Sequence, residues 1–230
     1  MPSPVPPFAA DAVVFDLDGV LVDTEGLWAR AEQQVTVDLG GLWGPEVQRA
    51  MIGRGPADAA TVLARHVGHP DPVEVEARLL EAALALFAGN VRARAGATSL
   101  VHGLARRVPL AVATNSRREL AEQSLAAAGF AETFTAVITA DDVPAAKPDP
   151  APYATACAAL GVEPARAVAF EDSPVGARSA RAAGCWVVGC PMGEHGDLEA
   201  AHVVVDDLSA IDVDALLAGS SRSALSQQGH

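Results

Sequence analysis

Seven side chains with the right types for chemistry stand directly after predicted strands of this chain. They follow the apolar runs 12–15, 110–113 and 167–170 and the loop after 136–138. They are four carboxylates, a hydroxyl, an amide and a lysine: Asp16, Asp18, Thr114, Asn115, Lys147, Glu171 and Asp172. In open parallel α/β sheets, ligands bind beyond the carboxyl ends of the strands. We therefore expect these side chains to converge on one crevice.

Four carboxylates in one crevice repel each other and raise each other's pKa values. A divalent cation resolves this conflict, and a set of hard oxygen ligands without paired His or Cys favours Mg²⁺. Mg²⁺ and Lys147 together would bring three positive charges against four negative ones, so the site could still accept a phosphate dianion. One carboxylate could then act as nucleophile and form an aspartyl-phosphate. A second carboxyl group could protonate the leaving alkoxide.

Lys147 is the single lysine of the chain, against fifteen arginines. A surface position would accept either residue. A position that keeps lysine in this background is expected to need a compact, mobile ammonium where a planar guanidinium would not fit.

The elements that position these residues alternate after residue 90 between short apolar strands and helices. Strands are predicted at 12–15, 108–113, 136–138, 167–170, 186–188 and 202–205, and helices at 118–128, 152–160, 175–183 and 209–217, with Gly129 as a C-cap. Continuously apolar strands that alternate with helices indicate an α/β fold with a Rossmann-like parallel sheet, covered on both faces.

A helical block interrupts this pattern between the first strand and the rest. Residues 27–87 show helical periodicity, so we predict a small α-helical cap domain at 24–91, inserted into a core of 8–23 and 92–219. The segments 1–7 and 220–230 are predicted to be flexible tails.

Composition excludes several classes of partner. Sixteen basic and 29 acidic residues leave a formal charge of −13, with a pI near 4.7. This argues against nucleic-acid phosphates and anionic lipid as partners. No apolar run approaches the ~20 residues of a membrane span, and the start reads as a loose tail rather than a signal peptide. Three cysteines without a CxxC pair favour a reduced, cytoplasmic setting.

Four ordered motifs resemble those of the haloacid dehalogenase superfamily. The first is Asp-Leu-Asp-Gly-Val-Leu-Val-Asp-Thr at 16–24, and the second is Ala-Thr-Asn at 113–115. The third is Lys-Pro at 147–148, and the fourth is Glu-Asp-Ser-Pro-Val-Gly at 171–176. Each motif falls at a predicted strand end or in the loop after it. The helical insert resembles the small cap of the phosphoglycolate-phosphatase and β-phosphoglucomutase branch.

The resemblance implies a role for each matching residue. Asp16 would be the nucleophile and a Mg²⁺ ligand, and Asp18 the general acid/base, with its backbone carbonyl also on the metal. The Thr114 hydroxyl and the Asn115 N–H would bind the phosphoryl group, and Lys147 would neutralise Asp16 and the phosphoryl oxygens. Asp172, with help from Glu171, would complete the metal site.

Three residues near the cap are candidate substrate contacts. Arg54 follows Gly53 where related caps place a substrate-contacting loop, and Glu25 lies just past the 23–24 hinge. Trp28 is expected in the cap core together with Trp43, with a substrate contact as the alternative. The pair His66 and His69 is expected in a solvated loop rather than in a metal site, and Cys185 and Cys190 as small buried side chains.

We therefore predict a Mg²⁺-dependent phosphatase of small phosphate monoesters, most of all sugar phosphates, acting as a monomer on a phosphorylated metabolite. The alternatives are a β-phosphoglucomutase-type mutase and a phosphoglycolate phosphatase. Trp28 stands at or near the position of a histidine found in the mutases, which counts against that alternative. Dehalogenases of the superfamily lack the second aspartate of the first motif, so the presence of Asp18 argues against dehalogenation. Receiver domains carry their acidic pair before the phosphoacceptor strand and have no large insert. Here the second acidic pair comes last and the insert is present, which argues against a receiver domain.

Overall fold

The computed structural model describes residues 5–51, 54–192 and 198–220. Gly53 and most of the two predicted tails lie outside these residues. Six parallel strands form one sheet in the order β3-β2-β1-β4-β5-β6. They are β1 (Ala12–Phe15), β2 (Leu110–Ala113), β3 (Ala136–Ile138), β4 (Ala167–Glu171), β5 (Trp186–Gly189) and β6 (Val203–Val204). The fold is therefore the predicted Rossmann-like α/β arrangement.

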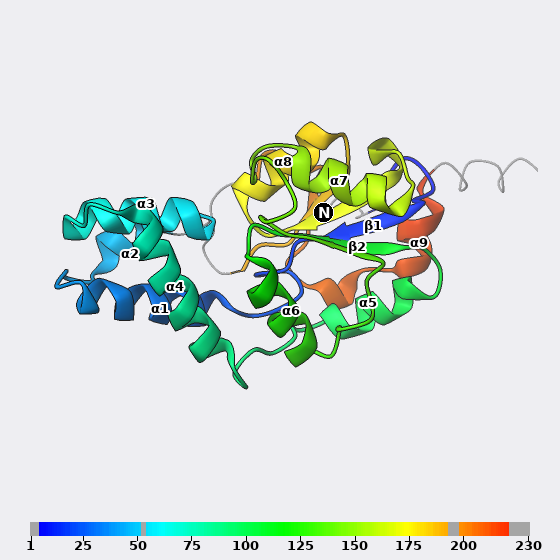
Figure 1. Cartoon of the computed structure of the whole chain (residues 1–230). Helices are drawn as coiled ribbons and strands as arrows, with labels where there is room; N and C mark the ends of the chain where they lie inside the picture. The colour runs from blue at the N-terminus through cyan, green and yellow to red at the C-terminus, as the bar shows by residue number, and fades with distance from the viewer. Residues whose placement is uncertain (1–4, 52–53, 193–197, 221–230) are drawn as a thin grey trace, which may run out of the picture.

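Helices cover both faces of the sheet (Figure 1). One layer holds α7 (Ala151–Leu160) and α8 (Pro174–Ala183), and the other holds α5 (Ala97–Ala105), α6 (Arg118–Ala127) and α9 (Val213–Ala218). In the central strand, Val14 packs toward the first layer, whereas Val13 and Phe15 pack toward the second. The Phe15 ring stacks on that of Phe170 at 5.1 Å between centroids. Burial on both faces explains why the strands read as continuous apolar runs.

Four helices between β1 and α5 gather at one side of the molecule, and we call them the cap helices (Figure 1). They are α1 (Glu25–Asp38), α2 (Pro45–Met51), α3 (Pro56–Val67) and α4 (Pro72–Phe87). They enclose their own apolar cluster, which includes Val35, Met51, Leu63 and Leu79. The Asp71 carboxylate caps α4 by accepting the N–H of Val73 at 2.9 Å.

The elements differ from the predicted ones in several places, and the strands predicted at 108–113 and 202–205 are shorter, at Leu110–Ala113 and Val203–Val204. The predicted helix 209–217 is two pieces, a 3₁₀ helix (Leu208–Ala210) and α9, because Asp212 caps α9 by accepting the N–H of Asp214 at 2.9 Å. Helix α5 and a 3₁₀ helix (Pro164–Arg166) were not predicted. Helix α6 ends at Ala127 with Ala128 as C-cap, and Gly129, with φ of 82°, follows it.

Among the described residues, none of the helices combines the length and the apolar character needed to cross a bilayer.

Candidate active site

Two short connections attach the cap helices to the sheet at the carboxyl end of β1. The loop after β1 closes on itself through the Gly19 N–H, which donates to the Val22 carbonyl at 2.9 Å. Asp23 N–H donates to the Arg92 carbonyl at 3.0 Å, so the outgoing and returning connections run together. The Arg94 guanidinium donates to the carbonyls of Gly19, of Cys190 at 2.6 Å and of Pro191 at 3.0 Å. These bonds fix the strand-end loops beneath the cap helices.

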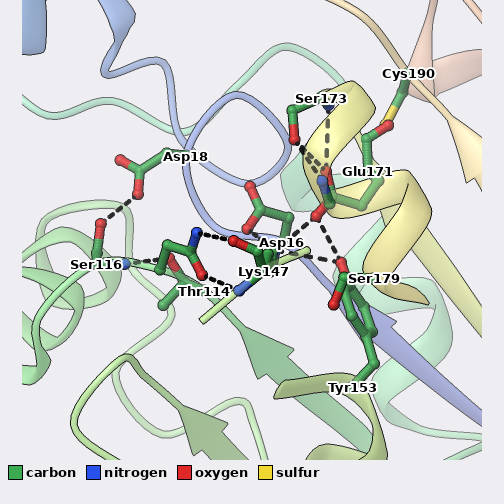
Figure 2. Close-up of polar contacts among 12 residues, drawn as sticks. Asp16, Asp18, Thr114, Ser116, Lys147, Tyr153, Glu171, Ser173, Ser179 and Cys190 are labelled. Atoms are coloured by element: carbon green, nitrogen blue, oxygen red, sulfur yellow. Dashed lines mark hydrogen bonds and ion pairs between the residues drawn. The ribbon is translucent and has the colours of Figure 1, made fainter. Parts of the chain in front are cut away.

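Lys147 lies between two carboxylates at the floor of this region (Figure 2). Its Nζ is 2.5 Å from Asp16 Oδ1 and 2.6 Å from Glu171 Oε1, and Glu171 is fully buried. Burial acts to lower the pKa of Lys147, but Asp16 and Glu171 outweigh it and the net shift is upward. The Lys147 side chain therefore stays a charged ammonium between the two carboxylates.

Glu171 is held by groups to which the sequence analysis assigned no role. Tyr153 OH, fully buried on α7, donates to Glu171 Oε1 at 2.8 Å, and its ring lies 4.9 Å from Lys147 Nζ. The Ser173 hydroxyl and N–H donate to Glu171 Oε2 at 3.1 and 3.2 Å. A Cβ on Gly176 would stand 1.7 Å from Glu171 Oε1, so only glycine fits there. Both Glu171 oxygens thus already accept hydrogen bonds from the protein.

Asp18 lies to the side of this group, next to Ser116 (Figure 2). It accepts three hydrogen bonds. Thr24 Oγ1 at 2.6 Å and Trp28 Nε1 at 3.2 Å donate to Oδ1, and Ser116 Oγ at 2.7 Å donates to Oδ2. Ser116 was not predicted, although it follows the Thr114-Asn115 pair directly. The three donors come from the cap junction and from the loop after β2, so they orient Asp18 from both sides of the cleft.

Thr114 and Asn115, two further predicted residues, lie between these groups. Thr114 is buried, and its hydroxyl accepts the Ser116 N–H at 3.0 Å. The Asn115 side chain is bonded to the backbone of Lys147, accepting its N–H at 2.9 Å and donating to its carbonyl at 3.3 Å. The Asn115 amide group therefore positions the lysine loop.

The donor set fits a hard divalent cation. Asp16, Glu171 and Asp172 each offer a carboxylate oxygen, and these oxygens lie within 4.8 Å of one another. Burial, opposed by Lys147 and reinforced by Glu171 and Asp18, raises the pKa of Asp16 to about 8. Burial, with Asp16 and Glu171, raises the pKa of Asp172 well above its usual range. A cation would relieve this accumulation of negative charge.

A cleft of about 520 Å³ opens above this floor, between the sheet and the cap helices. The three predicted cap contacts, Glu25, Trp28 and Arg54, all line it. Trp28 also packs edge to face on Phe87, at 5.5 Å between ring centroids, so it serves the core and the cleft. The cleft is further lined by residues that were not predicted, among them Glu32, Gln48 and Arg49. Glu32 could have been found from its spacing of four residues after Trp28.

The two histidines, the three cysteines and Trp43, which the sequence analysis also considered, do not line the cleft. His66, on α3, has its Nε2 2.9 Å from the Leu42 carbonyl, and His69, in the loop between α3 and α4, lies 3.7 Å from Glu74. The three cysteines are buried thiols, as expected for Cys185 and Cys190. Trp43 packs against the cap cluster.

Known proteins resemble this chain over most of its length. The profile of haloacid dehalogenase-like hydrolases matches residues 10–184. Validoxylamine A 7'-phosphate phosphatase of Streptomyces hygroscopicus subsp. limoneus is 36% identical over 208 residues, covering 86% of this chain and 94% of that protein. Fructose-1-phosphate phosphatase YqaB of Escherichia coli is 30% identical over 173 residues, 75% of this chain and 92% of that protein.

A solved structure shares the fold. A CbbY mutant from Rhodobacter sphaeroides, in complex with xylulose-(1,5)bisphosphate, superimposes with a TM-score of 0.80 at 29% identity, over 90% of this chain and 99% of that one. With the profile match over the four motifs, these likenesses assign the chain to a family: it belongs to the haloacid dehalogenase-like hydrolases.

Proposed function

We propose that this chain is a Mg²⁺-dependent phosphatase of small phosphate monoesters, chiefly sugar phosphates, that works through an aspartyl-phosphate on Asp16. The observation that carries the proposal is the contact of Lys147 Nζ with Asp16 Oδ1 at 2.5 Å, with Asp18 held alongside by three donors. This arrangement supplies a nucleophile paired with an ammonium group and a separate acid–base group on the same crevice floor.

The reaction divides into two transfers. An Asp16 oxygen attacks phosphorus and the bond to the leaving oxygen breaks, while Asp18 in its protonated form gives that oxygen a proton. Water then attacks the phosphorus of the aspartyl-phosphate, Asp18 takes the proton back, and phosphate leaves from Asp16. Thr114 and Asn115 hold the transferring phosphoryl group, and Lys147 neutralises its oxygens.

Asp16 and Asp172, with the backbone carbonyl of Asp18, would hold the cation. When bound, Mg²⁺ supplies positive charge that offsets the carboxylates and the developing charge on the phosphoryl oxygens. We assign Glu171 the different task of orienting Lys147, because both its oxygens already accept hydrogen bonds.

We propose further that residues 24–91 are a cap that closes over a core of 8–23 and 92–219 and excludes water during the first transfer. The cleft of about 520 Å³ suits a metabolite rather than a folded protein. Relatives named for fructose 1-phosphate and other phosphorylated compounds support a sugar phosphate as substrate. Trp28, with an indole N–H that cannot relay protons as an imidazole does, argues against the mutase reaction.

The test is phosphate release from a panel of esters, with and without Mg²⁺. The panel holds hexose phosphates, phosphoglycolate, nucleoside monophosphates and glycerol phosphate, and the Asp16→Asn variant serves as negative control. Metal-dependent release from a subset of sugar phosphates is expected. Release in excess chelator, or by the variant, would refute the mechanism. Glucose 6-phosphate formed from β-glucose 1-phosphate with a bisphosphate primer, and no phosphate release, would identify the mutase.

A further inference from the structure

Glu32 is a cleft carboxylate for which the proposed chemistry has no use. It lies on α1 four residues after Trp28 and eight after Thr24, so the three side chains share one face of that segment. Thr24 and Trp28 both donate to Asp18. Glu32 stands one turn beyond Trp28, about 6 Å further along the axis. This face therefore leads from the acid–base group to Glu32 along the wall of the cleft.

The carboxylate of Glu32 has no protein partner among the described residues: no hydrogen bond or ion pair of theirs reaches it. The Thr36 hydroxyl donates to the backbone carbonyl of Glu32 at 2.6 Å, and this bond does not involve the Glu32 side chain. Burial raises the pKa of Glu32 to about 7. Glu32 is half-buried, and polar groups withdrawn from water in folded proteins are usually paired. A carboxylate placed in a substrate cleft without a partner is suited to receive one from the ligand.

The other side chains around the cleft define what kind of ligand this would be. Gln48 and Arg49 on α2, and Arg54 just after it, bring donors, whereas Glu25 and Glu32 on α1 bring acceptors. Met51 and Leu79 add apolar surface. A leaving group with several hydroxyls can satisfy donors and acceptors together. A leaving group that carries its own carboxylate would meet Glu32 as a like charge.

We infer that Glu32 accepts a hydrogen bond from a hydroxyl or protonated amine on the leaving group, about one helix turn beyond the ester oxygen that faces Asp18. The inference rests on the proposed function and names its substrate class. The substrates are phosphate esters of polyhydroxylated or amino alcohols, and short acids such as phosphoglycolate are disfavoured. Glu32 is thus a specificity-determining residue and takes no part in phosphoryl transfer.

The experiment compares wild type, Glu32→Gln and Glu32→Leu on four probes with Mg²⁺ present. Fructose 1-phosphate, glucose 6-phosphate and glucosamine 6-phosphate carry donors, and phenyl phosphate carries none. A hydrogen bond to a charged group contributes enough that Glu32→Leu should lower kcat/KM on at least one donor-bearing ester about 10- to 100-fold. Glu32→Gln keeps an uncharged acceptor and should lose less. Phenyl phosphate should stay within about twofold for both variants. Glu81→Gln, the same change at an exposed position of α4, is the matched control.

The outcomes separate the two proposals. Wild type that hydrolyses none of the four probes contradicts the phosphatase itself, and the inference with it. Wild type that acts on phenyl phosphate, with variants that lose activity equally on every probe or on none, overturns the role of Glu32 alone. A larger loss on glucosamine 6-phosphate than on glucose 6-phosphate assigns the donor as an ammonium, and the reverse assigns it as a hydroxyl.

Discussion

Asp18 accepts three hydrogen bonds, from Thr24, Trp28 and Ser116, which hold its carboxyl group at a defined place beside Asp16. If Asp18 protonates the leaving oxygen, its contribution to the rate increases with the basicity of that oxygen. Asp18→Asn should therefore slow hydrolysis of sugar phosphates about 100-fold or more, and that of p-nitrophenyl phosphate far less. The measurement is kcat for both esters in the two proteins. Equal losses on the two esters would argue against a general-acid role.

Tyr153 links Lys147, which contacts the proposed nucleophile Asp16, to helix α7. Its hydroxyl donates to Glu171, and its ring lies under Lys147. Tyr153→Phe removes the hydroxyl and keeps the ring. Glu171 then loses one donor, and Lys147 is oriented less firmly toward Asp16. We expect kcat to fall about 10-fold at unchanged KM, as for the loss of one hydrogen bond to a charged group. An unchanged kcat with a lowered Tm would reduce Tyr153 to a packing role.

At the scale of elements, Gly19 allows the loops after β1 and β4 to approach each other closely. It has φ of 80°, and a Cβ there would stand 1.9 Å from Asp172 Oδ2. The loops after β1 and β4 can therefore meet only if this position carries no side chain. Gly19→Ala should displace the Asp172 carboxylate and raise the Mg²⁺ concentration for half-maximal activity at least about 10-fold.

A matched control for this variant exists in the loop between α1 and α2. Gly40 also has φ of 80°, but its Cβ would meet nothing within 4 Å. Gly40→Ala carries the same backbone strain without the clash, so it should lower Tm and leave the Mg²⁺ titration unchanged. Matching Mg²⁺ titrations for the Gly19 and Gly40 variants would mean that strain, rather than the approach to Asp172, is what matters.

The strand ends could be predicted because continuous apolar runs mark buried parallel strands, and parallel strands end on one side of the sheet. The groups that hold the predicted residues could not be predicted in the same way. Ser116 and Asp18 are 98 residues apart, and Tyr153 and Glu171 are 18 apart, so their bonds arise only from the tertiary fold. Asp212 begins α9 inside the predicted last helix for a local reason, an N-terminal side-chain cap, that the periodicity did not reveal.

The whole molecule carries a formal charge of −13, and several of its carboxylates gather in the active-site cleft. Asp16, Glu171 and Asp172 are gathered at the floor, and Glu25 and Glu32 lie on the α1 wall. Such an arrangement favours binding of cations and hydrogen-bond donors and opposes stability of the empty protein. The cytoplasmic location and the monomeric state stay predictions.

The Glu32 carboxylate gives the stability of the protein a measurable pH dependence. Burial raises its pKa from 4.5 to about 7, so the folded protein binds its proton more tightly than the unfolded chain does. Stability is therefore lost as pH rises from about 4.5 through about 7, by roughly 3 kcal/mol at full ionisation. The charged groups that share the cleft are Glu25 on α1, Arg49 on α2, Arg54 after it, and Asp16, Asp18, Lys147 and Asp172 at the floor.

Glu32→Gln removes this titration and keeps the side-chain volume. Its free energy of unfolding should match that of wild type at about pH 4.5 and exceed it at pH 8, with Tm higher by several degrees. Chemical denaturation at the two pH values, with Glu81→Gln alongside, measures the difference, which the control should lack. A variant that is less stable than wild type at pH 8 would mean that Glu32 stabilises the fold. Its place in the cleft would then be structural, whereas a gain in stability together with lost sugar-phosphate activity is the signature of a residue kept for its ligand.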